Sequence, residues 1–193
     1  MQLFLIRHGM TALGEEGRYQ GRLDAGLTKT GRDALCAAGS MPEHVYVSPA
    51  ARARETAEIL FPGSRQMIVS DLREMDFGAF EGRGWWEMEQ DADYRAWVDG
   101  GCMGRCPGGE DRTEFSARVC AAVRDILEAE TKTGENGVYI VAHGGTQMAV
   151  LEHWGRPPRE YYRWQRGCGC GWRLVWDERQ ETLTVEEEIS YLR

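Results

Sequence analysis

Two short apolar runs at opposite ends of the chain share one pattern. Residues 3–6 lead into a polar turn that contains His8, and residues 138–141 lead into a second polar turn that contains His143. Glycine follows each histidine. A continuous apolar run fits a β-strand that is buried on both faces, as strands of parallel sheets are. We therefore predict two buried strands whose carboxyl ends, with their histidines, meet at one edge of a sheet.

Helical periodicity alternates with further short strands along the rest of the chain. Apolar positions recur at helical spacing in four segments, residues 28–38, 52–60, 112–127 and 145–154. Additional strands are expected at residues 45–47 and 68–69, and a hairpin or two edge strands at residues 174–176 and 183–187. This alternation predicts an α/β fold: a three-layer αβα sandwich around a mostly parallel sheet with an antiparallel edge.

A segment at about residues 83–109 interrupts this alternation. Its first half is polar but carries the aromatic residues Trp85, Trp86, Tyr94 and Trp97, and its second half is rich in glycine. Glycine at this density predicts a break in regular structure. We expect a small helical and aromatic lid insertion here, although ordinary packing would explain the same aromatic residues equally well.

Composition narrows the class of protein. The 193 residues suffice for one domain, and 42% hydrophobic with 28% charged residues is typical of a globular chain, so we expect a single domain over residues 1–193. The net charge of −8 argues against a nucleic-acid partner. The apolar start is too short to span a membrane and does not fit a signal peptide, so we expect a cytoplasmic protein without a membrane partner. The oligomeric state stays open.

The six cysteines do not predict a metal site. Without an export signal, a disulfide framework is not expected. Cys102 with Cys106, and Cys168 with Cys170, could form two halves of a zinc site, but neither pair has the two-residue gap typical of structural zinc. We therefore expect reduced thiols and no bound metal.

Charged residues at other strand ends join the two histidines. Arg7 precedes His8, Arg52 begins the helix after the second strand, and Glu74 follows the third strand. Arginines bind phosphate oxygens through charge-assisted hydrogen bonds, a neutral imidazole can attack phosphorus, and a carboxyl group can exchange protons with the leaving oxygen and with water. Together the five residues predict a phosphoryl-transfer site that requires no metal and no cofactor.

The sequence resembles the histidine phosphatase superfamily, also called the phosphoglycerate mutase-like family, in an ordered set of motifs that spans most of the chain. These motifs are Arg7-His8-Gly9-x-Thr11, Gln20-Gly21, Leu27-Thr28 before Gly31, Ser48 with Arg52-Ala53 and Thr56-Ala57, Leu72 with Glu74, Gly78 and Glu81-Gly82, Pro107-Gly108-Gly109-Glu110, and Ala142-His143-Gly144. The family usually has Glu or Gln at the position of Met10, and a phosphate-binding Asn at the position of Gly14.

The resemblance implies roles for particular residues. His8 is implied as the phosphorylated nucleophile and Glu74 as the proton donor. The implied phosphate pocket consists of Arg7, Arg52 and His143, and the implied substrate-binding residues are Gln20, Thr11 and Gly144.

The implied activity is hydrolysis of a small phosphomonoester through a phosphohistidine. Two segments, around Tyr94 to Trp97 and around Gly167 to Trp172, resemble the alpha-ribazole phosphatase branch of cobalamin synthesis. An aromatic lid would suit a flat base on that substrate. Two alternatives stay open: a phosphoglycerate mutase, and a catalytically silent protein that only binds a phosphate ligand.

Overall fold

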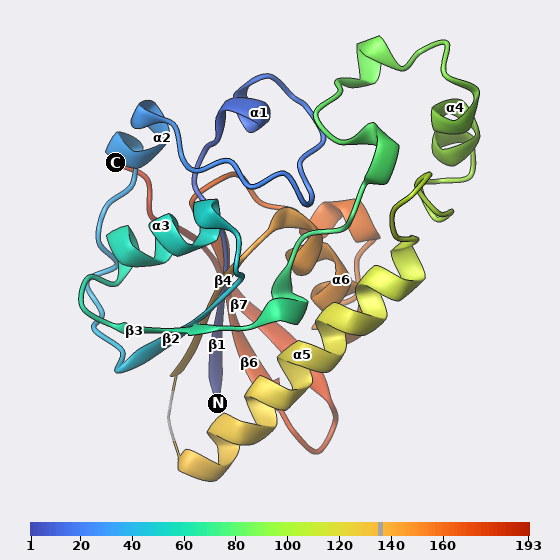
Figure 1. The fold of residues 1–193 in the computed structure, drawn as a ribbon. Coiled ribbons are helices and arrows are strands. Elements are labelled where there is room, and N and C mark those ends of the chain that lie inside the picture. Colours follow the sequence, from blue (N-terminus) through green and yellow to red (C-terminus); the bar gives the residue numbers. More distant parts are fainter. Residues whose placement is uncertain (135–136) are drawn as a thin grey trace.

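The structure is a computed structural model that describes residues 1–134 and 137–193 (Figure 1). The strands are β1 (Gln2–Arg7), β2 (His44–Val47), β3 (Arg65–Ile68), β4 (Gly137–Ala142), β5 (Gly155–Arg156), β6 (Cys170–Asp177) and β7 (Thr182–Ser190). The α-helices are α1 (Ala12–Glu15), α2 (Lys29–Ala34), α3 (Ala51–Leu60), α4 (Ala92–Asp99), α5 (Arg112–Thr133) and α6 (Gly144–Trp154). Short 3-10 turns lie at Ser70–Leu72, Gly78–Phe80, Trp85–Glu87 and Tyr161–Trp164.

β1 lies in the middle of the sheet, whose strand order is β3-β2-β4-β1-β6-β7-β5. It pairs in parallel with β4 and antiparallel with β6. β2 pairs in parallel with both β3 and β4, and β6 and β7 form an antiparallel pair. The predicted mostly parallel sheet with an antiparallel edge is therefore confirmed, and the two C-terminal strands form the hairpin.

Alternating residues of β1 pack into two separate cores. Leu3 and Leu5 join the hydrophobic cluster that contains the inner faces of α5 and α6. Ile6 joins a second cluster with the buried alanines of α3. In Figure 1 these helices correspondingly lie on opposite sides of the sheet. Because successive side chains of a strand point to opposite faces, a continuously apolar strand requires both helical layers, which explains the three-layer architecture.

The carboxyl ends of β1, β2 and β4 come together at one edge of the sheet. The His8 amide donates to the Ala142 carbonyl at 3.0 Å, and the Ser48 amide donates to the Val141 carbonyl at 3.1 Å. The last residues of β1 and β2 are thus held on either side of the end of β4. This places both predicted histidines next to each other, as the sequence pattern indicated.

The helix predicted at residues 28–38 is shorter than expected. The Thr28 hydroxyl caps its N-terminus by accepting a hydrogen bond from the Gly31 amide, but α2 ends at Ala34. The chain then turns extended and pairs with the C-terminus: the Cys36 amide donates to Tyr191, and the Arg193 amide donates to Ala34. Long-range backbone pairing therefore replaces the last turns of this helix.

The helix predicted at residues 112–127 is confirmed as α5 and extends to Thr133. In α5, the Glu114 amide donates to the Asp111 carboxylate at 2.9 Å, and the Glu114 carboxylate accepts in return from the Asp111 amide. Such a capping box fixes where a helix begins.

Within residues 1–134 and 137–193, no helix has the length and apolar character needed to cross a membrane.

The aromatic segment between residues 83 and 109 is divided into the turn Trp85–Glu87 and the helix α4, not one continuous helical stretch. Tyr94 and Trp97 are buried in the core beside α5 and α6, while Trp85 and Trp86 are exposed by 56% and 43%. Two of the four aromatic residues therefore have packing roles, and the other two face solvent.

Candidate active site

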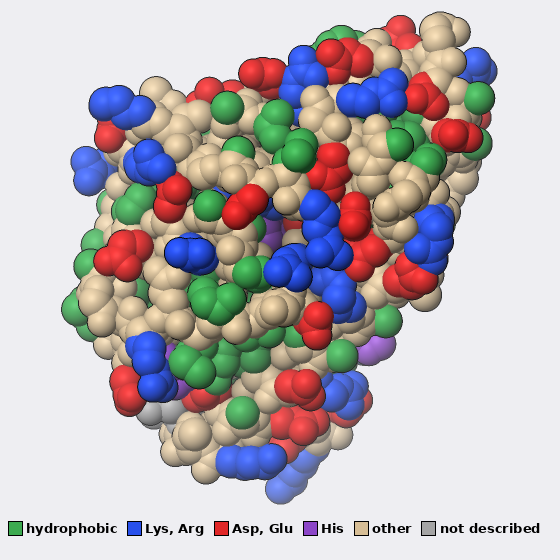
Figure 2. All heavy atoms as spheres, in the orientation of Figure 1, with side chains coloured by type: hydrophobic (Ala, Val, Ile, Leu, Met, Phe, Trp, Pro, Cys, Tyr) green, Lys and Arg blue, Asp and Glu red, His purple; other side chains and the backbone are tan. Residues whose placement is uncertain are grey.

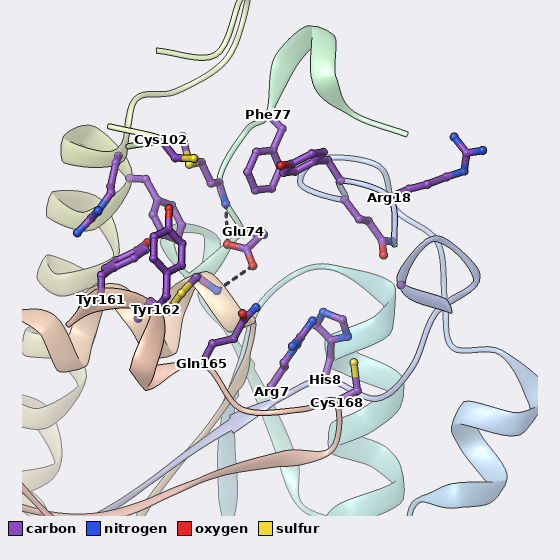
Figure 3. Close-up of a pocket in the computed structure, with 18 of the residues that line it drawn as sticks. Arg7, His8, Arg18, Glu74, Phe77, Cys102, Tyr161, Tyr162, Gln165 and Cys168 are labelled. Atoms are coloured by element: carbon purple, nitrogen blue, oxygen red, sulfur yellow. Dashed lines mark hydrogen bonds between the residues drawn. The ribbon is translucent and has the colours of Figure 1, made fainter. Parts of the chain in front are cut away.

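A cavity of about 290 Å³ opens at the edge of the sheet where β1 and β4 end. Among the residues singled out in the sequence, Arg7, His8, Thr11, Gln20 and Glu74 line it. Figure 3 shows Arg7 and His8 on one side of Glu74, Phe77 above it, and Tyr161 and Tyr162 on another side. In the space-filling view, a histidine side chain is visible between basic side chains near the middle of the face (Figure 2).

His8 is held in one orientation by its own backbone turn. Its Nδ1 lies 2.7 Å from the Gly9 carbonyl oxygen, and the residue is only 7% exposed. A carbonyl can only accept, so Nδ1 carries the proton and the lone pair lies on Nε2. Burial, reinforced by the charges of Arg52 and Arg7, holds the pKa of His8 well below its ordinary value. The imidazole is therefore neutral and nucleophilic at neutral pH.

The ring of His143 lies against the ring of His8. The two rings meet edge to face with their centres 5.2 Å apart, and His143 is fully buried. Its Nε2 lies 2.7 Å from the Ser48 hydroxyl, while its Nδ1 has no hydrogen-bond partner among the described residues. Burial, followed by the charge of Arg52, keeps the pKa of His143 well below its ordinary value. A bound phosphate dianion would oppose this effect by favouring the cation.

The two arginines are positioned in different ways. Arg7 lines the cavity and donates from Nη1 to the Arg166 carbonyl at 2.9 Å. Arg52 is buried beneath the loop of residues 20–23 and donates to the carbonyls of Leu23 and Gly21. The Nε atoms of both arginines are buried without a partner among the described residues. Arg52 therefore supports the loop above the cavity and contributes its charge to the two histidines.

Glu74 lies opposite His8 and is held by two backbone amides. Its carboxylate accepts from the Met75 amide at 3.0 Å and from the Gly145 amide at 3.1 Å, the two dashed contacts of Figure 3. Burial raises the pKa of Glu74 above its ordinary value, against the opposing effect of these amides and of Arg52 and Arg7. A carboxyl group whose pKa is raised is suited to donate a proton.

Thr11 and Gln20 form the loop side of the cavity. The Thr11 hydroxyl donates to Gln20 Oε1 at 2.7 Å and accepts from the Gly14 amide at 3.1 Å. Gln20 Nε2 in turn donates to the Leu23 carbonyl. These contacts connect the start of α1 to the loop that Arg52 supports. Gly14, where the family usually has a phosphate-binding side chain, itself lines the cavity.

The start of α6 binds Glu74, and Gly144, one of the implied substrate-binding residues, does not line the cavity. Gly145 lines the cavity, but its amide donates to Glu74, and Gly144 packs against the side chain of Gln165 instead of lining the cavity. A Cβ atom at residue 145 would lie 2.0 Å from Glu74 Oε1 and 2.9 Å from the Phe115 ring. Glycine at this position therefore allows Glu74 to rest on the helix N-terminus.

Replacing Gly145 with alanine is expected to reduce kcat/KM for alkyl phosphates about a hundredfold, because the new methyl group would displace the carboxyl of Glu74, the expected proton donor. Gly144→Ala is the matched control, since its Cβ would meet the movable end of Gln165. Steady-state kinetics on both variants, with circular dichroism to verify folding, checks this expectation. A folded Gly145→Ala protein with unchanged activity would contradict it.

The sequence did not reveal the far wall of the cavity. This wall consists of Phe77, which follows Glu74, Cys102 from the glycine-rich segment, and Tyr161, Tyr162 and Gln165 from the connection between α6 and β6. That connection has no clear strand or helix periodicity. Its one signal is the density of aromatic residues between Pro158 and Gly167.

None of the six cysteines is paired in a disulfide. In the part of the chain that the structure describes, no group of three or more His, Cys, Asp or Glu side chains could hold a metal ion.

Comparison with known proteins agrees with this geometry. Residues 3–188 match the model of the histidine phosphatase superfamily (branch 1). This chain belongs to that superfamily. The match extends from β1 almost to the end of β7 and so includes every segment that contributes to the cavity.

Individual relatives of this superfamily member differ in their named activities. "Putative phosphoserine phosphatase 2" of Hydrogenobacter thermophilus is 35% identical over 159 residues, covering 78% of this chain and 76% of the relative. "Probable phosphoglycerate mutase GpmB" of Erwinia tasmaniensis is 32% identical over 160 residues, covering 78% and 73%. Among solved structures, the alpha-ribazole phosphatase from Shigella flexneri has 25% identity and a TM-score of 0.80, covering 100% of this chain and 98% of that one.

Proposed function

We propose that this protein is a phosphomonoesterase that requires no metal and hydrolyses a small phosphorylated metabolite through a phosphohistidine at His8. The observation that carries this proposal is the arrangement of His8 and Glu74 on the same cavity. The Gly9 carbonyl leaves the lone pair on His8 Nε2, and Glu74 has a raised pKa. His8 Nε2 can therefore attack phosphorus, and the Glu74 carboxyl can protonate the leaving oxygen.

In the first step, His8 Nε2 forms a bond to phosphorus and the ester P–O bond breaks. The Glu74 carboxyl donates its proton to the leaving oxygen. The imidazole then bears a positive charge, and the hydrogen bond from Nδ1 to the Gly9 carbonyl stabilises it. In the second step, the Glu74 carboxylate takes a proton from water, the water oxygen attacks phosphorus, and the N–P bond breaks to release inorganic phosphate.

Arg7, Arg52 and His143 would stabilise the negative charge of the phosphoryl group. Each has a buried nitrogen without a partner among the described residues: Nε of the two arginines and Nδ1 of His143. Unpaired buried donors are costly, and a phosphate would offer them acceptor oxygens. Because Arg52 also holds the loop of residues 20–23, phosphate binding and loop position would be linked.

The substrate that we propose is alpha-ribazole phosphate, in which an aromatic base accompanies the phosphate. Phe77, Trp97, Tyr161 and Tyr162 give the cavity the aromatic lining that a flat base would contact. Trp97 and Cys102 of this lining come from the segment of residues 83–109. We propose that this segment is an insertion that covers the bound base.

The cations of the cavity wall favour a monoester over a bisphosphate. Arg18 donates to Glu87 at 2.5 Å and to Glu16 at 2.6 Å. Arg112 is paired with Glu152. A mutase must hold a bisphosphate, and carboxylates that already neutralise these arginines weaken the attraction of a second phosphate.

A substrate panel tests the proposal. Purified protein is expected to release phosphate from alpha-ribazole phosphate, with kcat/KM above that for 3-phosphoglycerate and p-nitrophenyl phosphate, and EDTA is expected to leave the rate unchanged. Isomerisation of 3-phosphoglycerate in the presence of a bisphosphate primer, without net phosphate release, would instead identify a mutase. No release from any phosphomonoester between mildly acidic and neutral pH would identify a binding protein.

A further inference from the structure

Arg112, the first residue of α5, stands between the catalytic cavity and a second hollow. It lines the catalytic cavity together with Tyr161, and it also lines a groove between α5 and α6 on the other side. Its guanidinium carbon lies 3.5 Å from the centre of the Tyr161 ring, and its side chain is 13% exposed. This contact places a cation flat against an aromatic residue of the substrate cavity.

Glu152 of α6 forms an ion pair with Arg112. Its carboxylate accepts a hydrogen bond from Arg112 Nη2. Glu152 lines the groove between the helices but not the catalytic cavity, so a substrate in the cavity would meet Arg112 and Tyr161 without touching Glu152. The carboxylate therefore influences the cavity without contacting the substrate, through its charge and through the arginine that it pairs with.

An arginine at the wall of a phosphate-binding cavity normally attracts a second anionic group on the substrate. Its fork of N–H donors matches a carboxylate especially well. When the protein already supplies a carboxylate, a substrate carboxylate must displace it or approach two groups whose charges cancel. The pairing thus removes the electrostatic advantage of a carboxylate on the leaving group, while the other aromatic residues of the cavity, Phe77, Trp97 and Tyr162, can still contact a neutral ring.

We propose that Glu152 determines the leaving-group class of this site: by neutralising Arg112, it disfavours phosphomonoesters that carry a carboxylate and favours those with a neutral, aromatic leaving group. The proposal rests on the proposed phosphatase function. It makes Glu152 a positioning residue that acts through Arg112 and Tyr161.

Two substrates of equal length test this inference, because 3-phosphoglycerate has a carboxylate where glycerol 3-phosphate has a hydroxymethyl group. Glu152→Gln is expected to lower KM for 3-phosphoglycerate about tenfold, since the freed arginine can pair with the carboxylate. KM for glycerol 3-phosphate and kcat for both substrates are expected to change little. Adding Arg112→Met, which keeps an unbranched side chain but removes the charge, is expected to cancel the gain.

Glu181→Gln is the matched control, because Glu181 pairs with Arg124 outside the catalytic cavity. Equal changes for both substrates in Glu152→Gln would show a purely structural role and overturn the proposal. Weaker binding of 3-phosphoglycerate would also overturn it, since Glu152 would then orient Arg112 toward the carboxylate. Calorimetry in a His8→Ala background measures the affinity of the protein for both compounds without turnover. It therefore tests the role of Glu152 even if the proposed phosphatase function is wrong.

Discussion

Replacing His8 with alanine is expected to lower kcat by at least about four orders of magnitude and to abolish the phosphoenzyme. The variant loses the nitrogen that forms the bond to phosphorus, and His143 does not replace it, because His143 is fully buried and does not line the cavity. Rapid quench with a ³²P-labelled substrate, followed by acid and base treatment, measures the phosphohistidine, which is acid-labile and stable in base.

His153→Ala is the control for this experiment. His153 lies near the end of α6, is exposed and does not line the catalytic cavity. It is expected to retain full turnover and labelling. Acid-labile label that persists in His8→Ala would refute the assignment of His8 as the nucleophile. Binding of inorganic phosphate to His8→Ala, measured by calorimetry, would separate a lost nucleophile from a collapsed site.

The positions of the site residues could be predicted from the sequence because parallel strands impose them. Each strand of a parallel sheet ends at the same edge, so polar residues that directly follow β1, β2 and β4 must meet there. This is why Arg7, His8 and His143 are adjacent in the structure although 135 positions, counted from His8 to His143 in the numbering, separate the two histidines. The two helical layers were predictable for the same reason, since the strands are apolar on both faces.

The aromatic wall could not be predicted in this way. Tyr161 and Tyr162 begin a short 3-10 turn in the connection between α6 and β6, and the course of this connection depends on contacts that no local pattern encodes. One such contact is the hydrogen bond from the Trp172 indole to the Trp164 carbonyl, which ties the connection to β6. The same limit applies to the end of α2, where pairing between Cys36 and Tyr191 outweighs helical periodicity.

The role of Gly145 also depends on contacts between distant segments. The sequence shows two consecutive glycines at a helix start, a pattern typical of anion binding. Only the fold brings Glu74 onto that helix end, where the carboxylate itself takes the place of an external anion. In the function proposed above, the helix N-terminus would therefore position the proton donor, and the arginines and histidines would bind the substrate phosphate.

Glu74→Gln is expected to distinguish proton donation from a structural role through the leaving group. For an alkyl phosphate, whose leaving oxygen needs a proton, kcat/KM is expected to fall about a thousandfold. For p-nitrophenyl phosphate, whose leaving group is stable as an anion, the loss is expected to be about tenfold. The amide keeps the size of the side chain, and one of its atoms can still accept from the Met75 or Gly145 amide, so equal losses on both substrates would indicate a structural role.

The pH dependence of the same variant provides a second test. Burial raises the pKa of Glu74, and the first step needs its protonated form, so kcat/KM of the native protein for the alkyl phosphate is expected to fall as pH rises through that pKa. His8 must be neutral, and its lowered pKa keeps it so until the pH is well below 6.5, which leaves a window in which both groups have the required form. Ionisation of the substrate is common to both proteins, so the ratio of native to Glu74→Gln kcat/KM isolates the carboxyl group. This ratio is expected to decrease with rising pH, and a ratio independent of pH would exclude Glu74 as the proton donor.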